Sequence, residues 1–188
     1  MSCRMSLPLL LSALSLLAGS LAFGQAPTPP LAQIEAMKKL DLWVGDWKGS
    51  GWSSSGGDQR IEFDLVEKVE RKVGGTVLLV EGRGTTKTDN GEEVVTHDGL
   101  ALVYFDDKAG RYHWNGHDLP WGAIDAEPKL LDGGFEWRIQ IDERGATVRF
   151  TIRFDEKRWY EVGEASMDGK TWNPFMEMTL ERQKEVSR

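Results

Sequence analysis

The chain has 188 residues, with 30 Asp and Glu against 23 Lys and Arg, and a formal net charge of −7 at neutral pH. This acidic balance disfavours nucleic acids and anionic membrane surfaces as partners, because both are bound through a basic footprint. The only cysteine is Cys3, so the chain beyond it has no disulfide and no thiolate nucleophile.

Residues 1–24 have the composition of a secretory signal peptide. They carry a single charge, and Leu7 to Leu21 consists mostly of Leu, Ala and Ser. This stretch is short for a membrane span, and Ala22 and Gly24 supply the small residues of a cleavage site before Gln25. An uncleaved membrane anchor is the alternative. We expect a periplasmic or secreted mature chain with no stable membrane insertion, and export without disulfides favours a bacterial envelope.

Residues 25–39 predict a Pro-rich linker and a short helix. Apolar residues recur at a spacing of three from Leu31 to Leu40, and Pro30 stands near the start of this segment. We expect the helix to cover one end of a single domain at residues 40–183, followed by a tail at 184–188.

Regular turn signals divide the domain into about ten short strands. There are nine such breaks: Gly56-Gly57, Gly74-Gly75, Asn90-Gly91, Asp106 to Gly110, Leu119-Pro120, Asp132 to Gly134, Glu143 to Gly145, Asp155 to Lys157 and Asp168-Gly169. Many short strands hide their edges best by closing into a barrel. The sequence therefore predicts an all-β protein, a single antiparallel up-and-down β-barrel with the short helix closing one end.

Alternation of apolar and polar residues predicts the inward faces and the register of three hairpins. Setting residues 141 and 146 opposite each other, with three-residue turns at Asp155 to Lys157 and around Lys108, gives the following opposed pairs: Trp137 with Phe150, Ile139 with Val148, Ile152 with Tyr160, Phe150 with Val162, Tyr104 with Tyr112, and Leu102 with Trp114. The segment Asp118 to Leu131 contains Pro120 and Pro128, which restrict strand pairing. It is expected to be an edge-like strand or an open loop at the barrel rim.

The step Gly45-x-Trp47 after a short helix resembles the opening signature of the lipocalin and calycin group. The resemblance implies that Trp47 closes the base of the barrel and that Arg182, on the last strand, packs over it by a cation–π contact.

The chain also resembles the exported bacterial lipocalin-like domains of unknown function. The matching motifs are Trp43 to Trp47, Gly74-Gly75, Tyr104 to Asp106 and Asp168 to Trp172. The nitrobindin-like haem barrels are a more distant likeness. They hold haem through a late histidine, and here none follows His117, so no cofactor is expected.

Several side chains are candidates for binding a ligand. Glu67 and Arg71 interrupt an apolar face of one strand, and Glu81 and Arg83 follow on the next. Such charges can fix the polar head of a ligand, and arginine suits a carboxylate. The alternative is that they lie in water at the rim. Aromatic candidates for the cavity wall, which could equally be core, are Trp114, Trp137 and Tyr160.

The three histidines share one face in the predicted register. His97 and His117 would be diagonal neighbours, close enough to share a zinc ion, with His113 on the same face and Asp118 on the other. A zinc site needs three placed ligands, so the alternative, a wet outer wall, is preferred and no metal site is predicted.

The sequence favours an exported barrel that binds a small hydrophobic or amphipathic molecule, with no assigned catalytic residues. One alternative is a hydrolase or isomerase on the same barrel, with Glu67 or Glu81 as general base. Another is a filled barrel that acts as an interaction module for envelope proteins, which predicts no cavity.

Overall fold

A computed structural model describes residues 28–54, 59–119, 121–141 and 146–184. Several sequence predictions lie outside the described residues: the signal peptide with its cleavage site, the turns at Gly56-Gly57 and Glu143 to Gly145, Pro120, and all but the first residue of the C-terminal tail. Within the described ranges, no helix is both long and apolar enough to cross a membrane.

The described chain is an all-β fold with one short helix, as predicted. Helix α1 spans Leu31–Lys38, and the 3-10 turns η1 and η2 span Asp41–Trp43 and Val73–Gly75. The described strands are β1 (Gly45–Ser53), β2 (Ile61–Lys72), β3 (Val77–Lys87), β4 (Glu93–Asp106), β5 (Arg111–Leu119), β6 (Gly122–Ala126), β7 (Lys129–Leu131), β8 (Gly134–Gln140), β9 (Thr147–Phe154), β10 (Arg158–Ser166) and β11 (Asn173–Arg182).

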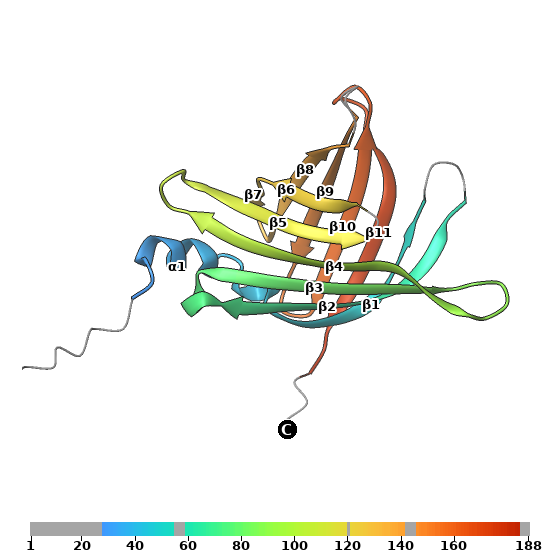
Figure 1. Cartoon of the computed structure of the whole chain (residues 1–188), viewed down its shortest axis with the longest axis horizontal. Helices are drawn as coiled ribbons and strands as arrows, with labels where there is room; N and C mark the ends of the chain where they lie inside the picture. Colours follow the sequence, from blue (N-terminus) through green and yellow to red (C-terminus); the bar gives the residue numbers. More distant parts are fainter. Residues whose placement is uncertain (1–27, 55–58, 120, 142–145, 185–188) are drawn as a thin grey trace, which may run out of the picture.

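These strands form one antiparallel sheet that curls into a half-barrel (Figure 1). Each strand pairs with its neighbour in the chain except at β6 and β7, and β1 pairs with β11. In Figure 1, β1 to β5 run across the view and β8 to β11 cross their direction, so the two halves surround an interior. The up-and-down order confirms the predicted all-β barrel fold, with eleven strands in place of about ten.

The sheet ends where proline interrupts the chain. β6 ends at Ala126 and β7 begins at Lys129, with Pro128 between them. Proline has no N–H and cannot take a full part in a ladder. No ladder joins β6 to β7 among the described residues, although β6 contacts β8. The segment Asp118 to Leu131 thus contributes to an open seam, in agreement with its predicted edge-like character.

Helix α1 and η1 cover one end of the barrel, as the sequence predicts. The hydroxyl of Tyr112 donates a hydrogen bond to the carbonyl of Ala36 at 2.7 Å. Arg71 donates to the carbonyl of Met37 at 3.1 Å and pairs with Asp41. The Met37 side chain is fully buried. These contacts join the helical segment to β2 and β5.

Trp47 and Arg182 face each other across β1 and β11 at the same end. The guanidinium carbon of Arg182 lies 4.1 Å from the centroid of the buried Trp47 ring. The same guanidinium donates to the carbonyls of Val44 at 2.6 Å, Glu156 at 2.7 Å and Leu42. The contact expected from the resemblance is therefore present, and it joins the first strand to the last.

One of the three predicted hairpin registers is confirmed. Trp137 lies opposite Phe150, and Ile139 lies opposite Val148. The other two predicted registers are wrong by one residue. Between β4 and β5 the pairs include Tyr104 with His113 and Leu102 with Asn115. Between β9 and β10 they include Ile152 with Glu161 and Thr151 with Val162.

Both errors have the same cause, an aspartate that closes a four-residue turn. The side chain of Asp106 accepts hydrogen bonds from the backbone N–H groups two and three residues ahead, at 2.9 and 3.0 Å. Asp155 does the same at 2.7 and 2.8 Å. Each turn is one residue longer than predicted. Because side chains alternate along a strand, a shift of one residue moves them to the opposite face.

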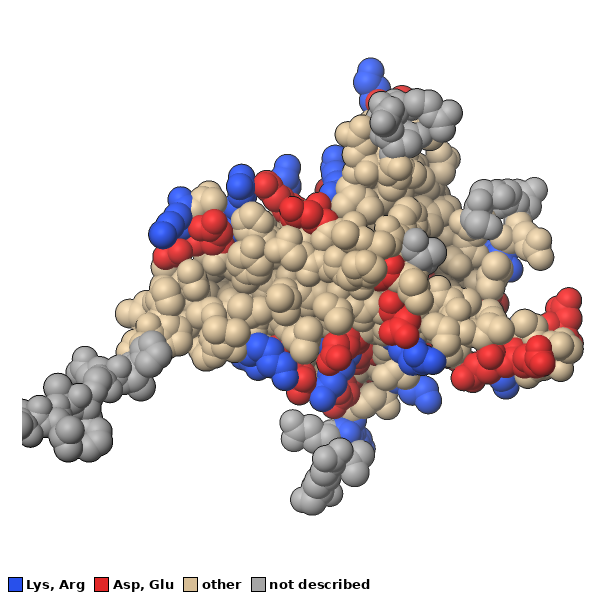
Figure 2. Space-filling view, in the orientation of Figure 1, with Lys and Arg blue, Asp and Glu red and all other residues tan. Residues whose placement is uncertain are grey.

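The shift places several apolar side chains of β4 on the outer surface. Leu100 and Leu102 are 52% and 43% exposed, while Ala101 and Val103 are buried. Tyr104 stacks on His113, which lies on the adjoining strand. On the face shown in Figure 2, charged side chains gather toward the edges and other residue types cover the middle.

We predict that Arg182→Lys lowers the free energy of unfolding by about 2 kcal/mol. A lysine ammonium cannot reproduce the planar fork that reaches several carbonyls, and hydrogen bonds to charged groups contribute about 1.5–3 kcal/mol each. Urea denaturation measures the change. Arg83→Lys is the control, because Arg83 is an exposed residue whose ion pair with Asp98 lies at the surface, and it should have little effect. Equal stability of the two variants would contradict the role given to Arg182.

Candidate functional site

The half-barrel encloses a cavity of about 340 Å³ that lies between its two sides. Small-molecule sites have volumes of roughly 300–1,000 Å³, so this one suits a small ligand. The predominantly apolar wall includes Phe63, Leu65, Val80, Ala101, Trp114, Ile124, Trp137, Ile139, Phe150, Trp159, Phe175, Met176 and Met178. A filled barrel, which predicts no cavity, is therefore not supported.

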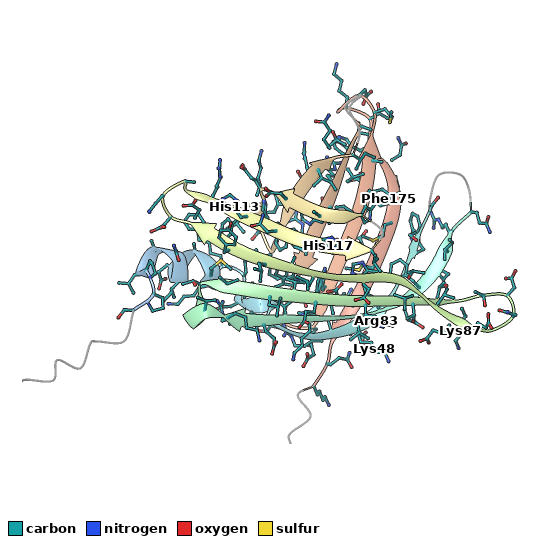
Figure 3. The ribbon with its side chains drawn as sticks, viewed as in Figure 1. Lys48, Arg83, Lys87, His113, His117 and Phe175 are labelled. Atoms are coloured by element: carbon teal, nitrogen blue, oxygen red, sulfur yellow. The ribbon has the colours of Figure 1, made fainter. Side chains whose placement is uncertain are left out.

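The two ends of the cavity differ. At one end Trp159 lies below the cavity, with its ring centroid 5.2 Å from that of Trp43 and 6.0 Å from that of Trp47. The opposite end is bordered by residues near strand ends, among them Trp121 and Phe175, whose ring centroids are 6.3 Å apart. Phe175 is labelled on β11 in Figure 3. The mouth is therefore on the side away from α1.

A row of stacked rings forms one wall. The rings of Trp114 and Trp137 lie 5.0 Å apart at 17°, and those of Trp137 and Phe150 lie 4.4 Å apart at 18°. The Nε1 atom of Trp137 is buried and has no hydrogen-bond partner among the described residues. Trp114 and Trp137, both predicted from the sequence, do line the cavity. Aromatic walls of this kind suit flat or apolar molecules.

Glu67 brings a carboxyl group into this apolar wall. Glu67 is only 6% exposed, and it lies opposite Trp47 on β1 and opposite Gly82 on β3. A Cβ atom at Gly82 would lie 2.3 Å from Glu67 Oε1, so the glycine provides the space that the carboxyl occupies. Burial raises the pKa of Glu67 well above its usual range, and the nearby carboxyls of Glu161 and Asp118 raise it further.

Glu161 supplies a second buried carboxyl from β10. It is 7% exposed, and its Oε2 accepts a hydrogen bond of 3.2 Å from Trp159 Nε1. Burial raises the pKa of Glu161 to about 7, although this hydrogen bond and the charge of His97 act in the opposite direction. Near neutral pH, Glu161 can therefore exchange a proton with a bound molecule or with solvent.

His97 and Asp118 complete the polar part of the wall. His97 Nδ1 lies 3.0 Å from Asp118 Oδ2, and His97 Nε2 lies 3.8 Å from Glu67 Oε1. The second distance is too long for a hydrogen bond. Asp118 Oδ1 is buried without a hydrogen-bond partner among the described residues. With the largely exposed His117 included, five titratable groups from β2, β4, β5 and β10 thus border one cavity.

The structure separates the four charged residues predicted to orient a ligand. Only Glu67 lines the cavity. Arg71 shares its strand face, but its guanidinium bonds to α1, to η1 and to the carbonyl of Gly75. Glu81 and Arg83 are exposed on the outer face of β3, where Figure 3 labels Arg83 near Lys48. The prediction that Glu81 and Arg83 point inward is wrong, because Leu78, Val80 and Gly82 form the inner face of β3.

Tyr160 also lies outside the cavity wall. The four-residue turn at Asp155 moves Tyr160 to the outer face of β10 and brings Trp159 and Glu161 inward. Sequence reasoning missed Glu161 for this reason. The sequence signal that could have identified Glu161 is Asp155, because an aspartate at the start of a turn accepts hydrogen bonds from the backbone N–H groups that follow it.

The predicted arrangement of the histidines is wrong in the same way. His97 and Asp118 share the inner face, whereas His113 and His117 lie along the outer face of β5 (Figure 3). His97 and His117 are therefore not partners for a shared zinc ion. In the described ranges, no group of three or more His, Cys, Asp or Glu side chains is placed to hold a metal ion.

Two glycines inside strands mark the site in the sequence. Gly82 and Gly99 are cross-strand partners, and they lie in one row between Glu67 on β2 and Asp118 on β5. Gly82 lies within β3, and the register shift comes later, after Gly84. An interior glycine often marks a place where another group approaches the backbone closely.

We predict that Glu161→Gln removes part of the pH dependence of stability. The native state keeps a proton that the unfolded chain releases from pH 4.5 upward, so stability falls as pH rises from 4.5 to about 7. At about 1.4 kcal/mol per pH unit, the loss is about 3 kcal/mol. Glutamine is neutral at every pH and retains an oxygen for Trp159. E161Q should match the wild type near pH 4.5 and exceed its stability at pH 8.

Urea unfolding at several pH values measures this difference. Glu181→Gln, on the exposed face of β11, is the control and should follow the wild-type curve. Parallel curves for E161Q and the wild type would show that Glu161 does not titrate in this way.

Comparisons with known proteins concern the fold. No protein-family model matches the chain, and no curated protein matches it. The structure is similar to the crystal structure of Rv2717c from M. tuberculosis, with a TM-score of 0.57 and 15% identity over 79% of this chain and 98% of that chain. It is also similar to the S-type phycobiliprotein lyase CPES from Guillardia theta, with a TM-score of 0.54 and 13% identity over 85% and 100%. At this level of identity the similarities show a shared fold, the curled antiparallel half-barrel.

Proposed function

We propose that this protein binds a small, largely apolar ligand in the cavity of its half-barrel. The observation that carries the proposal is the enclosed, aromatic-lined volume of about 340 Å³ with a few polar groups in its wall. Apolar cavities with a small number of convergent polar groups are the usual form of small-molecule sites. The predicted signal peptide accords with action in the periplasm or outside the cell.

The fold comparison supports the same proposal. One of the similar structures is named as an S-type phycobiliprotein lyase. The likeness is one of fold, so the class of ligand has to come from the residues of this cavity. Those residues are Trp114, Trp137 and Phe150 for the apolar part, and Glu67, His97, Asp118 and Glu161 for the polar part.

We predict saturable binding of a neutral apolar probe, N-phenyl-1-naphthylamine, measured by its fluorescence. Ala101→Phe places a ring in the cavity from β4 and should weaken binding by about tenfold or more, which corresponds to about 1.4 kcal/mol. Leu102→Phe is the matched control, because Leu102 is the next residue and lies 43% exposed on the outer face. It should bind as the wild type does.

Circular dichroism in the near ultraviolet establishes that A101F keeps its tertiary structure. If A101F does not fold, Ile124→Phe, at another lining position, replaces it in the test. Non-saturable binding to the wild type, or equal binding by a folded cavity-filling variant, would exclude the cavity as the binding site.

The buried carboxyls favour a second function, acid–base catalysis by a hydrolase or isomerase. A carboxyl group with a raised pKa inside a cavity is a common feature of such sites. Of the two candidate general bases from the sequence, Glu67 lies in the cavity and Glu81 is exposed on the outer face. Of these two candidates, only Glu67 therefore remains for the catalytic alternative.

If the protein is such an enzyme, Glu67→Gln should lower kcat by about a hundredfold or more on a substrate that the wild type converts. A panel of aryl esters and enolisable ketones provides the assay, and Glu81→Gln provides the control. Unchanged turnover by E67Q would remove Glu67 from the mechanism, and absence of turnover across the panel would leave the binding function preferred.

A further inference from the structure

We propose that the cavity selects ligands whose polar end is a cation, such as a protonated primary amine on an apolar or aromatic body. This inference rests on the proposed function, because it names the chemical class of ligand for the same cavity. It reverses the sequence-based expectation that an arginine would hold a carboxylate there.

The charged groups of the cavity wall are predominantly acidic. Glu67, Asp118 and Glu161 contribute three carboxyls, while the described lining residues include no lysine and no arginine. The described bases that line the cavity are His97 and His117, and the His117 side chain lies largely on the exposed outer face of β5. Once these carboxyls are ionised, the imidazole of His97 cannot balance their charge, so an anionic ligand would meet repulsion and a cationic ligand attraction.

Backbone geometry shows that the carboxyls occupy space provided for them. Glu67, Gly82, Gly99 and Asp118 form one cross-strand row over β2, β3, β4 and β5. A Cβ atom at Gly82 would collide with the carboxyl of Glu67, and one at Gly99 would lie 3.1 Å from Asp118 Cβ. The acidic groups are therefore part of the inner wall and not charges that extend to the rim.

Asp118 has an acceptor atom that the described protein does not use. Its Oδ2 contacts His97, but its Oδ1 is buried without a hydrogen-bond partner among the described residues. A buried acceptor without a partner is costly, and an ammonium group offers three donors and no acceptor. A protonated amine can therefore donate a hydrogen bond to the unpaired Oδ1 atom of Asp118.

The aromatic part of the wall accommodates the apolar body of the ligand. Trp114, Trp137 and Phe150 stack in one row, and Trp159 lies next to Glu161. Because Trp137 stacks on both of its neighbours in this row, the rings contribute apolar contact and the carboxyls provide the attraction for the cation.

Protonation links this selectivity to pH. The titratable groups that line the cavity are Glu67 on β2, His97 on β4, Asp118 and the largely exposed His117 on β5, and Glu161 on β10, while β3 and β11 contribute the non-titrating residues Gly82 and Met178. The pKa of Glu67 is raised well above its usual range and that of Glu161 is raised to about 7. A cation favours the ionised carboxylates, so its binding should release protons and strengthen as pH rises from 5.5 to 8.

The test compares three probes with the same apolar body and different heads: 1-naphthylmethylamine, 1-naphthalenemethanol and 1-naphthoic acid. Isothermal titration calorimetry on the mature chain at pH 8 should give a dissociation constant for the amine at least about tenfold below that of the alcohol, because charge-assisted hydrogen bonds are the stronger ones. The acid should bind most weakly. Titrations in phosphate and in Tris buffer should differ in heat, as proton release requires.

Two carboxyl variants and one control assign the preference to the cavity. Glu67→Gln and Glu161→Gln should each reduce the amine's advantage over the alcohol to about threefold or less, because each removes a carboxyl from the cavity wall. Glu81→Gln removes a carboxyl from the exposed outer face of β3 and should retain the full advantage.

The outcomes separate this inference from the function on which it rests. If the alcohol binds saturably and the amine binds no better at pH 8, the cavity binds ligands but does not select cations. If none of the three probes binds saturably, the proposed function itself fails. An amine preference that survives both cavity variants would place the cation elsewhere and would also overturn the inference.

Discussion

The aspartates at two turns determine which side chains enter the cavity. Asp106 and Asp155 each hold a four-residue turn through two backbone hydrogen bonds. Each turn determines which residues of its two strands lie opposite one another and therefore share a face. The first turn brings His97 and Asp118 to the inner face, and the second brings Glu161 there. A turn one residue shorter would place other residues opposite one another and would move these polar groups away from the interior. The chemistry of the cavity therefore depends on the backbone geometry of these two turns.

The cavity has a cost in stability that the rest of the fold offsets. Two carboxyls buried among aromatic rings hold protons that they would lose in water, and this opposes folding as pH rises. The opposite end of the barrel is tightly packed, with Trp43, Trp47 and Trp159 buried beneath the cavity. Local conflict of this kind is typical of functional positions, where the sequence departs from what a core alone would prefer.

Period-two alternation was sufficient to predict the fold, but it did not predict the full site. It correctly placed Glu67, Trp114 and Trp137 on inward faces, because their strands alternate clearly between apolar and polar residues. It failed on β3, where Val77 to Val80 are all apolar and either face could have been the inner one.

It also failed on β10, where the alternation of Tyr160 and Val162 was assigned to the wrong face. Arg71 illustrates a different limit. Its inward position was predictable from its strand, but its contacts with a helix more than thirty residues earlier depend on tertiary structure.

The open seam gives the half-barrel unequal mechanical strength around its circumference. Separating β1 from β11 would break a ladder of seven residue pairs, from Trp47 with Arg182 to Ser53 with Met176. Separating β6 from β7 and β8, across the seam, would break no ladder among the described residues. Ile124 on β6 and Trp137 on β8 line the cavity on either side of that seam. Widening of the wall at this place would therefore cost side-chain packing between β6 and β8 but no ladder among the described residues.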